Sequence, residues 1–479
     1  MTRALSVTEG ASAVRERYAV VGVGLLAIAA LAWHHMAILG DGFWYIATGR
    51  LLIAHHGLPA LDPFSFATVR HDWRNVSTGS EVLFAFVGDR LGLRALMVLA
   101  TCVESLAVGS LWLSASRRTA TRLWLLPLAL LFVHVDSEDL SARGQIFGDL
   151  GFVLLLLALR RLRAGRRVSW LVPLSMGAVW VNVHLSFLLG VFVPLLFLGA
   201  LALEPRDERP PLRPFLFFSA LSLLGSLANP DTYHYLVHAL RCAFAPVVGM
   251  FDLFQSPDLH DPVWLMAPVM AVGLAVARSV AGPARGARAD AALLVVFLAA
   301  ACSSRRYVTE LLAMEALLAG PLLDRLPAWA RFSSAPERAL QAGVGLLVVG
   351  LSVRSLAEPK DPLRDVPALA ARFVTDHSLP RNVMNPYHWG GYLAYAWNGN
   401  PPYFIDGRDI FGLVKNGILD DAIRLRADPS TFERILDAYE IKTVLWERNG
   451  LLSAYLAEQS AWRLAYRDSI AVVYTRVPR

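Results

Sequence analysis

The sequence predicts a mainly α-helical protein, a polytopic bundle of membrane helices followed by a small α/β domain. Three observations lead to this fold class. Of 479 residues, 55% are hydrophobic and only 18% are charged, whereas soluble domains are about a quarter charged. Long apolar runs recur along residues 18–355, and none occurs after them. From about residue 356 charges are spread evenly, so a second, water-exposed domain is expected there.

About eleven apolar runs are each long enough to be considered a membrane span. They cover residues 18–39, 93–114, 122–135, 146–160, 168–183, 186–203, 214–228, 262–279, 289–303, 307–323 and 339–355. The long segment 40–92 between the first two is a loop. Its residues 43–56 are aromatic and apolar, which favours a helix lying in the membrane interface. Gly57, Pro59 and Pro63 end that helix.

The arginines indicate how the bundle is oriented. Clusters of arginine fall on alternate connecting segments, the densest between Arg160 and Arg167, and the other segments hold few, with Arg305-Arg306 as the exception. Positive charge marks the inner side, so we expect an inner N-terminus and an outer 40–92 loop, 229–261 loop and C-terminal domain. Because the arginines flank apolar runs and do not form one patch, no nucleic-acid partner is expected.

The domain division expected from composition is 1–355 for the transmembrane domain and 356–479 for the outer domain. In the outer domain, residues 381–384, 402–405, 441–446 and 469–474 read as buried strands. Helical spacing covers 419–426 and 430–439. Strands that alternate with helices predict a small α/β domain with a parallel sheet.

Asp41 is the first candidate for chemistry. It follows the first apolar run directly, in Gly40-Asp41-Gly42-Phe43-Trp44. Acidic residues at the edge of the membrane core are costly and are therefore treated as functional hypotheses. The alternative is structural, because an aspartate at a helix start can accept backbone N–H groups as a cap. The local sequence leaves both open.

Further polar residues recur on the other segments predicted to be outer. They are Glu81 in the first loop, Asp136, Glu138, Asp139 and Arg143 in the second, His184 after Trp180-Val181-Asn182-Val183, and Arg305 and Arg306 in the fifth. Most have a structural alternative. Asp136 to Asp139 could be a solvated loop end or caps of the following helix, and Asn182 and His184 could be helix–helix hydrogen-bond partners. Arg305 and Arg306 could simply reach the surface. Together they suit a reaction on a lipid-linked phosphate. A carboxylate would deprotonate a hydroxyl or hold a divalent cation, and arginines would neutralise phosphate.

The C-terminal domain has its own polar motifs, His388-Trp389-Gly390-Gly391-Tyr392 and Asp406-Gly407-Arg408. Asp-Gly after a strand is often only a turn, and the glycine pair could simply allow close packing. Strand ends are also where α/β domains bind ligands. His388, Asp406 and Arg408 are therefore candidates for binding an acceptor or for closing the membrane site.

These motifs resemble those of the GT-C glycosyltransferases, in particular a bacterial group related to protein mannosyltransferase-like enzymes. The similar stretches run from Gly40 to Ser65, from Trp180 to His184, and through the two motifs of the C-terminal domain. The resemblance implies that Asp41 is the catalytic base or a metal-site carboxylate. It implies that Asp136, Glu138 or Asp139 supplies a second acid, with Mg or Mn as a possible cation. The donor would be a polyprenyl-phosphate sugar.

The function expected from these features is an inverting glycosyltransferase of the bacterial cytoplasmic membrane that acts on the outer face. The acceptor, whether glycan, lipid or protein, stays open. One alternative is a lipid or glycan transporter, for which paired breaks in the spans and internal symmetry would be evidence; neither is evident. The other is a non-catalytic assembly protein, in which Asp41 and Glu138 could be neutralised without consequence.

Overall fold

The computed structural model describes residues 2–57, 61–68, 77–135, 141–243, 255–280, 286–325, 335–408 and 410–478. By internal contacts the chain divides into two units. The first, here the helical unit, comprises Met1–Met36, Val98–Leu140 and Gln145–Pro359. The second, here the sheet unit, comprises Ala37–Met97, Ser141–Gly144 and Lys360–Arg479. The division into domains 1–355 and 356–479 stays a prediction.

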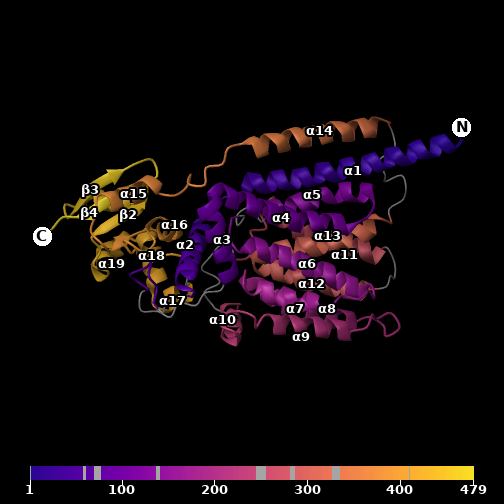
Figure 1. Cartoon of the computed structure of the whole chain (residues 1–479), viewed down its shortest axis with the longest axis horizontal. Helices are drawn as coiled ribbons and strands as arrows, with labels where there is room; N and C mark the ends of the chain where they lie inside the picture. Colours follow the sequence, from indigo (N-terminus) through magenta and orange to yellow (C-terminus); the bar gives the residue numbers. More distant parts are fainter. Residues whose placement is uncertain are drawn as a thin grey trace. The chain divides into compact units, whose positions relative to one another are not determined.

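Every predicted span is a helix in the structure (Figure 1). The helices are α1 (Thr2–His35), α4 (Leu93–Ala115), α5 (Thr119–Val135), α6 (Gln145–Arg163), α7 (Leu171–Trp180), α8 (Leu188–Ala202), α9 (Arg213–Gly225), α11 (Pro262–Val280), α12 (Ala287–Ser303), α13 (Val308–Leu323) and α14 (Ala335–Ala357). A further helix, α10 (Tyr233–Ala243), lies in the segment 229–261 that was expected to be a loop. Among the described residues three helices, Tyr18–His35, Leu93–Ala115 and Leu185–Ala202, are long and apolar enough to cross a bilayer.

Small residues let neighbouring helices of this unit approach closely. At Gly177 in α7, a methyl group would overlap the backbone carbonyl of Ser222 in α9. At Gly225 in α9, it would overlap the carbonyl of Leu174 in α7. Lipid provides no hydrophobic drive between helices, so such backbone contact is a principal source of helix association in membranes. The glycines therefore fix α7 and α9 against each other.

The sheet unit begins with α2 (Gly40–His55) and α3 (Thr78–Leu91). Residues Gly42 to Gly49 of α2 are buried, because the helix packs against both α3 and α16 (Gly390–Trp397). The segment 43–56 is thus a helix, as predicted. Its position in a membrane interface stays a prediction.

The C-terminal part of this unit is a small sheet with surrounding helices (Figure 1). The strands are β1 (Val383–Met384), β2 (Thr443–Glu447), β3 (Trp462–Arg467) and β4 (Ala471–Arg476), and the helices are α15 (Ala368–Asp376), α17 (Ile410–Lys415), α18 (Ile418–Ala427), α19 (Phe432–Ala438) and α20 (Leu451–Glu458). The sheet order is β1-β2-β4-β3. A mainly helical chain that ends in a small α/β domain is the fold class predicted, and it is confirmed.

The prediction of a parallel sheet was wrong. Among the strands that the structure describes, β1 and β2 are parallel, whereas β4 pairs antiparallel with both β2 and β3. The sequence prediction missed β3, an edge strand in which three of six residues are exposed and two are arginines, so that no apolar run marks it. Asp468 closes the β3–β4 turn by accepting the backbone N–H groups of Ile470 and Ala471, each at 2.7 Å.

The segment 402–405, predicted as a strand, forms only isolated bridges in the structure. Tyr403 makes single bridges to Ser65 and Val383 only. Pro401 and Pro402 precede it, and proline has no N–H to donate to a sheet ladder. The segment is nevertheless buried and bonded, and it carries the residues described next.

Candidate active site

Asp41 lies in the first turn of α2, beside a short segment from the second predicted outer loop. Ala37 pairs with Ser141 in a single parallel bridge, and the hydroxyl of Ser141 accepts the N–H of Leu39 at 3.1 Å. At Gly42, an added methyl group would come within 2.5 Å of the carbonyl oxygen of Ala142. The absence of a side chain at this glycine therefore lets the 141–144 segment lie against the start of α2.

This arrangement brings Arg143 to Asp41. The guanidinium Nη1 donates to Asp41 Oδ2 at 3.2 Å, and the indole Nε1 of Trp44 donates to Oδ1 at 3.1 Å. The Asp41 side chain is 42% exposed, whereas that of Arg143 is 17% exposed. The Asp41 carboxylate is thus oriented by two donors and is still partly exposed to solvent.

The structure does not support a capping role for Asp41. The N-cap of α2 is Leu39, and no side chain makes a cap bond there. Asp41 is inside the helix, and the hydrogen bonds found at its two oxygens come from side chains. A carboxylate in the first turn still benefits from the positive end of the helix dipole.

The glycine motifs of the C-terminal domain meet the start of α2. At Gly391, a methyl group would overlap the carbonyl oxygen of Gly40, so α16 and α2 are in backbone contact. At Gly407, a methyl group would lie 3.4 Å from Asp41 Oδ1 and 2.9 Å from the hydroxyl of Tyr387. Asp41 therefore lies where three sequence motifs converge within one unit.

The Tyr387 phenol is a further polar group near this carboxylate. Burial, and then the charges of Asp41 and Asp406, raise the pKa of Tyr387 well above its ordinary value. The phenol therefore keeps its proton at neutral pH. Sequence reasoning passed over it because a tyrosine beside His388 carries no spacing signal.

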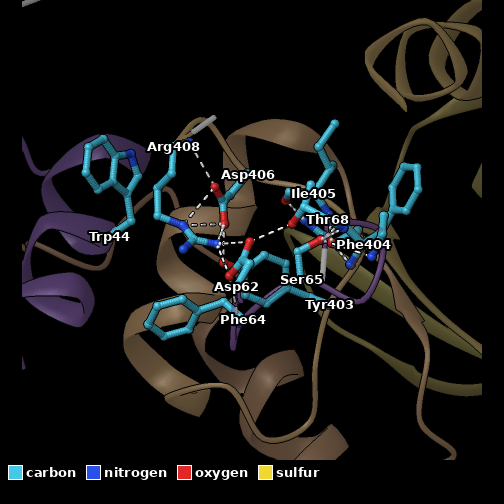
Figure 2. A network of polar contacts seen from close by, with 12 residues as sticks. Trp44, Asp62, Phe64, Ser65, Thr68, Tyr403, Phe404, Ile405, Asp406 and Arg408 are labelled. Carbon is cyan, nitrogen blue, oxygen red and sulfur yellow. Dashed lines mark hydrogen bonds and ion pairs between the residues drawn. The ribbon is translucent and has the colours of Figure 1, made fainter. Parts of the chain in front are cut away.

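Asp406 and Arg408 lie in a buried ionic network with Asp62 (Figure 2). Arg408 Nη2 lies 2.9 Å from both oxygens of Asp62 and 2.8 Å from Asp406 Oδ2, and Nε lies 2.9 Å from the same Asp406 oxygen. Exposed fractions are 3% for Arg408, 8% for Asp62 and 4% for Asp406. The guanidinium stacks on Phe64, with 4.5 Å from Cζ to the ring centre.

Neighbouring groups complete this network and fix its backbone. The hydroxyls of Thr68 and Tyr403 donate to Asp62 and Asp406, respectively. The side-chain oxygen of Asn385 accepts two successive N–H groups, those of Phe404 and Ile405. The network thus links the first loop to the C-terminal segment within the sheet unit.

Arg408 is a permanent cation in this position. Burial lowers its pKa, but the Asp406 and Asp62 carboxylates outweigh that effect and raise the pKa well above the ordinary value. Its two partners and its burial favour a structural role. The substrate-binding role expected for Asp406 and Arg408 from the sequence stays a prediction.

His388 and Glu81 both lie against α2, but they differ in exposure. His388 Nε2 is 3.5 Å from Glu447, which also pairs with Arg426 at 3.1 Å. Burial lowers the pKa of His388, and the Glu447 charge opposes this shift. Glu81 is fully buried in α3, where its backbone carbonyl packs on Gly49. His388 is therefore reachable, whereas Glu81 is a core residue.

The other candidates belong to the helical unit. His184 precedes a 3-10 turn, and its Nδ1 accepts the N–H of Ser186 at 3.2 Å. Asn182, in the turn after α7, donates to the carbonyl of Ala228, which follows α9, at 2.7 Å. Arg305 stacks on Trp264 at 5.2 Å, and Arg306 follows it in the same short turn.

Asp136, Glu138 and Asp139 lie outside the described residues. Among the residues that are described, no three histidine, cysteine or acidic side chains lie together as metal ligands would. Asp41 contributes one carboxylate, and both its oxygens already accept N–H donors. A divalent cation at Asp41 would need a further ligand from the second-loop acids, and it stays a proposal.

The sequence matches no known protein-family model, and no curated protein matches it. Its structure is similar to that of several solved proteins. The oligosaccharyltransferase of Archaeoglobus fulgidus in its apo form has a TM-score of 0.57 at 11% identity, over 90% of this chain and 69% of that one. ArnT from Cupriavidus metallidurans, solved bound to undecaprenyl phosphate, has a TM-score of 0.55 at 15% identity, over 96% and 97%.

A third similar structure is the arabinofuranosyltransferase AftD from Mycobacteria, with a TM-score of 0.50 and 13% identity. The match covers 97% of this chain and 40% of that protein. At these identities the likeness defines the fold and leaves the activity to be argued from the site. The chain has the fold of the GT-C membrane glycosyltransferases.

Proposed function

We propose that this protein is a membrane glycosyltransferase that moves a sugar from a polyprenyl-phosphate carrier to an acceptor hydroxyl. The observation that carries the proposal is the Asp41 carboxylate, held by Arg143 and Trp44 and partly exposed beside Gly407. The shared fold supports it, since the similar structures are of glycosyltransferases and one of them holds undecaprenyl phosphate.

In the proposed reaction Asp41 is the general base. Its carboxylate takes the proton of the acceptor hydroxyl as that oxygen attacks the anomeric carbon of the donor sugar. The bond between that carbon and the phosphate oxygen breaks, and its electron pair leaves with the polyprenyl phosphate. Attack opposite to the leaving group inverts the anomeric centre. A well-placed base of this kind contributes about 10²- to 10⁴-fold to the rate.

Arginine is suited to the leaving phosphate because its planar fork binds phosphate oxygens through two parallel bonds. Arg143 is the first candidate, since its guanidinium lies beside the proposed base and donates to Asp41 at 3.2 Å. His184, Arg305 and Arg306 are proposed as further contacts to the donor. One of Asp136, Glu138 and Asp139 is proposed as the second acid.

The proposed location is the bacterial cytoplasmic membrane, with the reaction on its outer face, as the arginine distribution indicates. A divalent cation held by Asp41 and a second-loop acid would add charge neutralisation at the phosphate. His388, which is partly exposed next to the start of α2, is proposed to contact the acceptor.

The test is Asp41→Asn in the native host, with Asp89→Asn as the matched control. Asp89 is also about 40% exposed and also pairs with one arginine, Arg50, so its neutralisation removes a comparable ion pair. Lipid extracts and surface glycans are analysed by mass spectrometry. We expect a polyprenyl-phosphate sugar to accumulate, and one glycan to lose a residue, in the Asp41 strain alone.

The same experiment separates the alternatives. If the protein were a transporter, loss of its function would leave the lipid cargo on the membrane face where it is made. Asp41→Asn would then cause no change that can be attributed to the loss of a base. A non-catalytic assembly protein would tolerate Asp41→Asn. Unchanged lipids and glycans at normal protein abundance would therefore reject the enzyme and leave the assembly role.

A further inference from the structure

The helical unit contains a cavity of about 360 Å³ that the proposed reaction does not use. It lies where α6, α11 and α13 end and α12 begins. Its charged lining is Arg160 and Arg163 from α6, Arg278 from α11, Arg325 after α13, and Asp290 from α12. This is the end of the bundle that the arginine distribution predicts to be inner, whereas Asp41 is predicted to be outer.

The charges of this lining do not balance. Asp290 pairs with Arg163 and, at 3.4 Å, with Arg278. Arg163 also donates to the carbonyl of Gly286 at 3.0 Å, and Arg160 donates to the carbonyl of Ser114 at 2.5 Å. Carbonyls orient a guanidinium but carry no net charge. Within the lining, four arginines therefore face one carboxylate. The charge of Asp324, next to Arg325, acts on Arg160 from outside the lining, so two positive charges remain uncompensated around the cavity.

The rest of the lining is apolar. It includes Leu156, Phe197, Leu294, Met314 and Pro321, from four different helices. A cavity with apolar walls and a group of cations is complementary to an anionic amphiphile, whose acyl chain contacts the walls and whose phosphate contacts the arginines. Its volume falls within the range of cavities that bind small ligands.

We propose that this cavity binds one phosphate-bearing membrane lipid, such as an anionic phospholipid, as a bound lipid separate from the donor. A free phosphate ion offers the same charge but would leave the apolar walls uncovered. The proposal does not depend on the proposed glycosyl transfer. It assigns to the helical unit a lipid site that holds the ends of α6, α11, α12 and α13 together.

The test uses the full chain in nanodiscs of phosphatidylcholine with 20% phosphatidylglycerol as the probe, on the order of one anionic lipid in five as in charged leaflets. Lipid retained after detergent extraction is counted by native mass spectrometry. The variants are Arg160→Gln with Arg325→Gln, and Arg325→Gln alone. Arg161→Gln is the matched control, because Arg161 is next in sequence, exposed, and outside the cavity lining.

We expect retained phosphatidylglycerol to fall at least tenfold in the double variant and at least threefold in Arg325→Gln, and to be unchanged in Arg161→Gln. If the double variant does not fold, Arg325→Gln decides, because that exposed side chain can be shortened without opening the bundle. Equal retention in all variants, or an equal loss in Arg161→Gln, would overturn the proposal. Displacement of the lipid by inorganic phosphate would replace it with a free-anion site.

Discussion

Replacement of the buried Arg408 by methionine should destabilise the sheet unit strongly. Methionine keeps much of the side-chain length and can still contact Phe64, but it removes the charge between Asp62 and Asp406. Both carboxylates are less than a tenth exposed. Removing one partner of a buried ionic network costs about 3–5 kcal/mol, because the remaining charges are left uncompensated.

The assay is thermal unfolding of the purified protein in detergent, followed by tryptophan fluorescence. If the sheet unit unfolds cooperatively, 3–5 kcal/mol corresponds to a fall in Tm on the order of 10 °C. Arg372→Met is the control. Arg372 pairs with Asp376 at 3.2 Å but is 78% exposed, and pairs of that kind contribute about 1 kcal/mol or less. Its Tm should change by only a few degrees.

A further variant tests the reason given. Adding Asp62→Asn and Asp406→Asn to Arg408→Met removes the uncompensated charges and should recover part of the lost Tm. The reasoning is refuted if Arg408→Met melts like the wild type. If it also loses activity while the Tm is unchanged, Arg408 binds substrate, as the sequence motif first indicated.

Three further predictions follow from the site. Gly391→Ala should lower both Tm and transfer activity, because its methyl group overlaps a carbonyl in the first turn of α2; Gly57→Ala, where a methyl group meets nothing within 4 Å, should leave both unchanged. Trp44→Phe keeps an aromatic ring but loses the indole N–H that donates to Asp41, so kcat should fall about 3- to 10-fold without loss of protein. The pKa of His388 is lowered in the folded protein, so the unfolded chain binds the proton first as the pH falls through 6.5, and the folded state loses stability. His388→Gln should therefore reduce the fall in Tm between pH 7.5 and 5.5. An identical pH profile of Tm in the variant and the wild type would contradict this.

The helices of the bundle could be predicted from the sequence because a single signal, a long apolar run, defines each of them. Short helices of the sheet unit lack it. α16 contains Gly390 and Gly391, which disfavour helices in isolation, and it forms because those glycines lie against Gly40 and Ile405. β3 was missed because Trp462, Leu464 and Tyr466 alternate with Arg463, Ala465 and Arg467, so the strand contains no continuous apolar run.

Asp41 could be chosen from sequence because its place after an apolar run is itself informative. Its partners could not be ranked in the same way. From sequence, Arg143 was one of several arginines that could neutralise phosphate. The pairing of residues 37–39 with 141–142 is what brings it to Asp41. The opposite holds for Arg408, which the sequence offered as a binding residue and the structure surrounds with Asp62, Asp406 and Phe64.

Asp62 and Tyr387 show what local patterns cannot supply. Asp62 belongs to a loop motif whose partner is 346 residues away in the chain. Tyr387 lies near Asp41 through the approach of Gly407, a contact between segments that no short-range spacing encodes. The first contact accompanies the bridge between Ser65 and Tyr403, and the second accompanies the packing of α2 on α16.

The measurement that tests the central claim most directly is the rate of sugar transfer by purified protein. The donor would be the lipid that accumulates in the Asp41→Asn strain, and the wild type would be compared with Asp41→Asn and Asp89→Asn. If Asp41 is the general base, its variant loses at least about 10²-fold in kcat while donor binding is retained, and the Asp89 variant stays within about twofold of the wild type. An Asp41→Asn protein that transfers sugar at the wild-type rate would contradict the account.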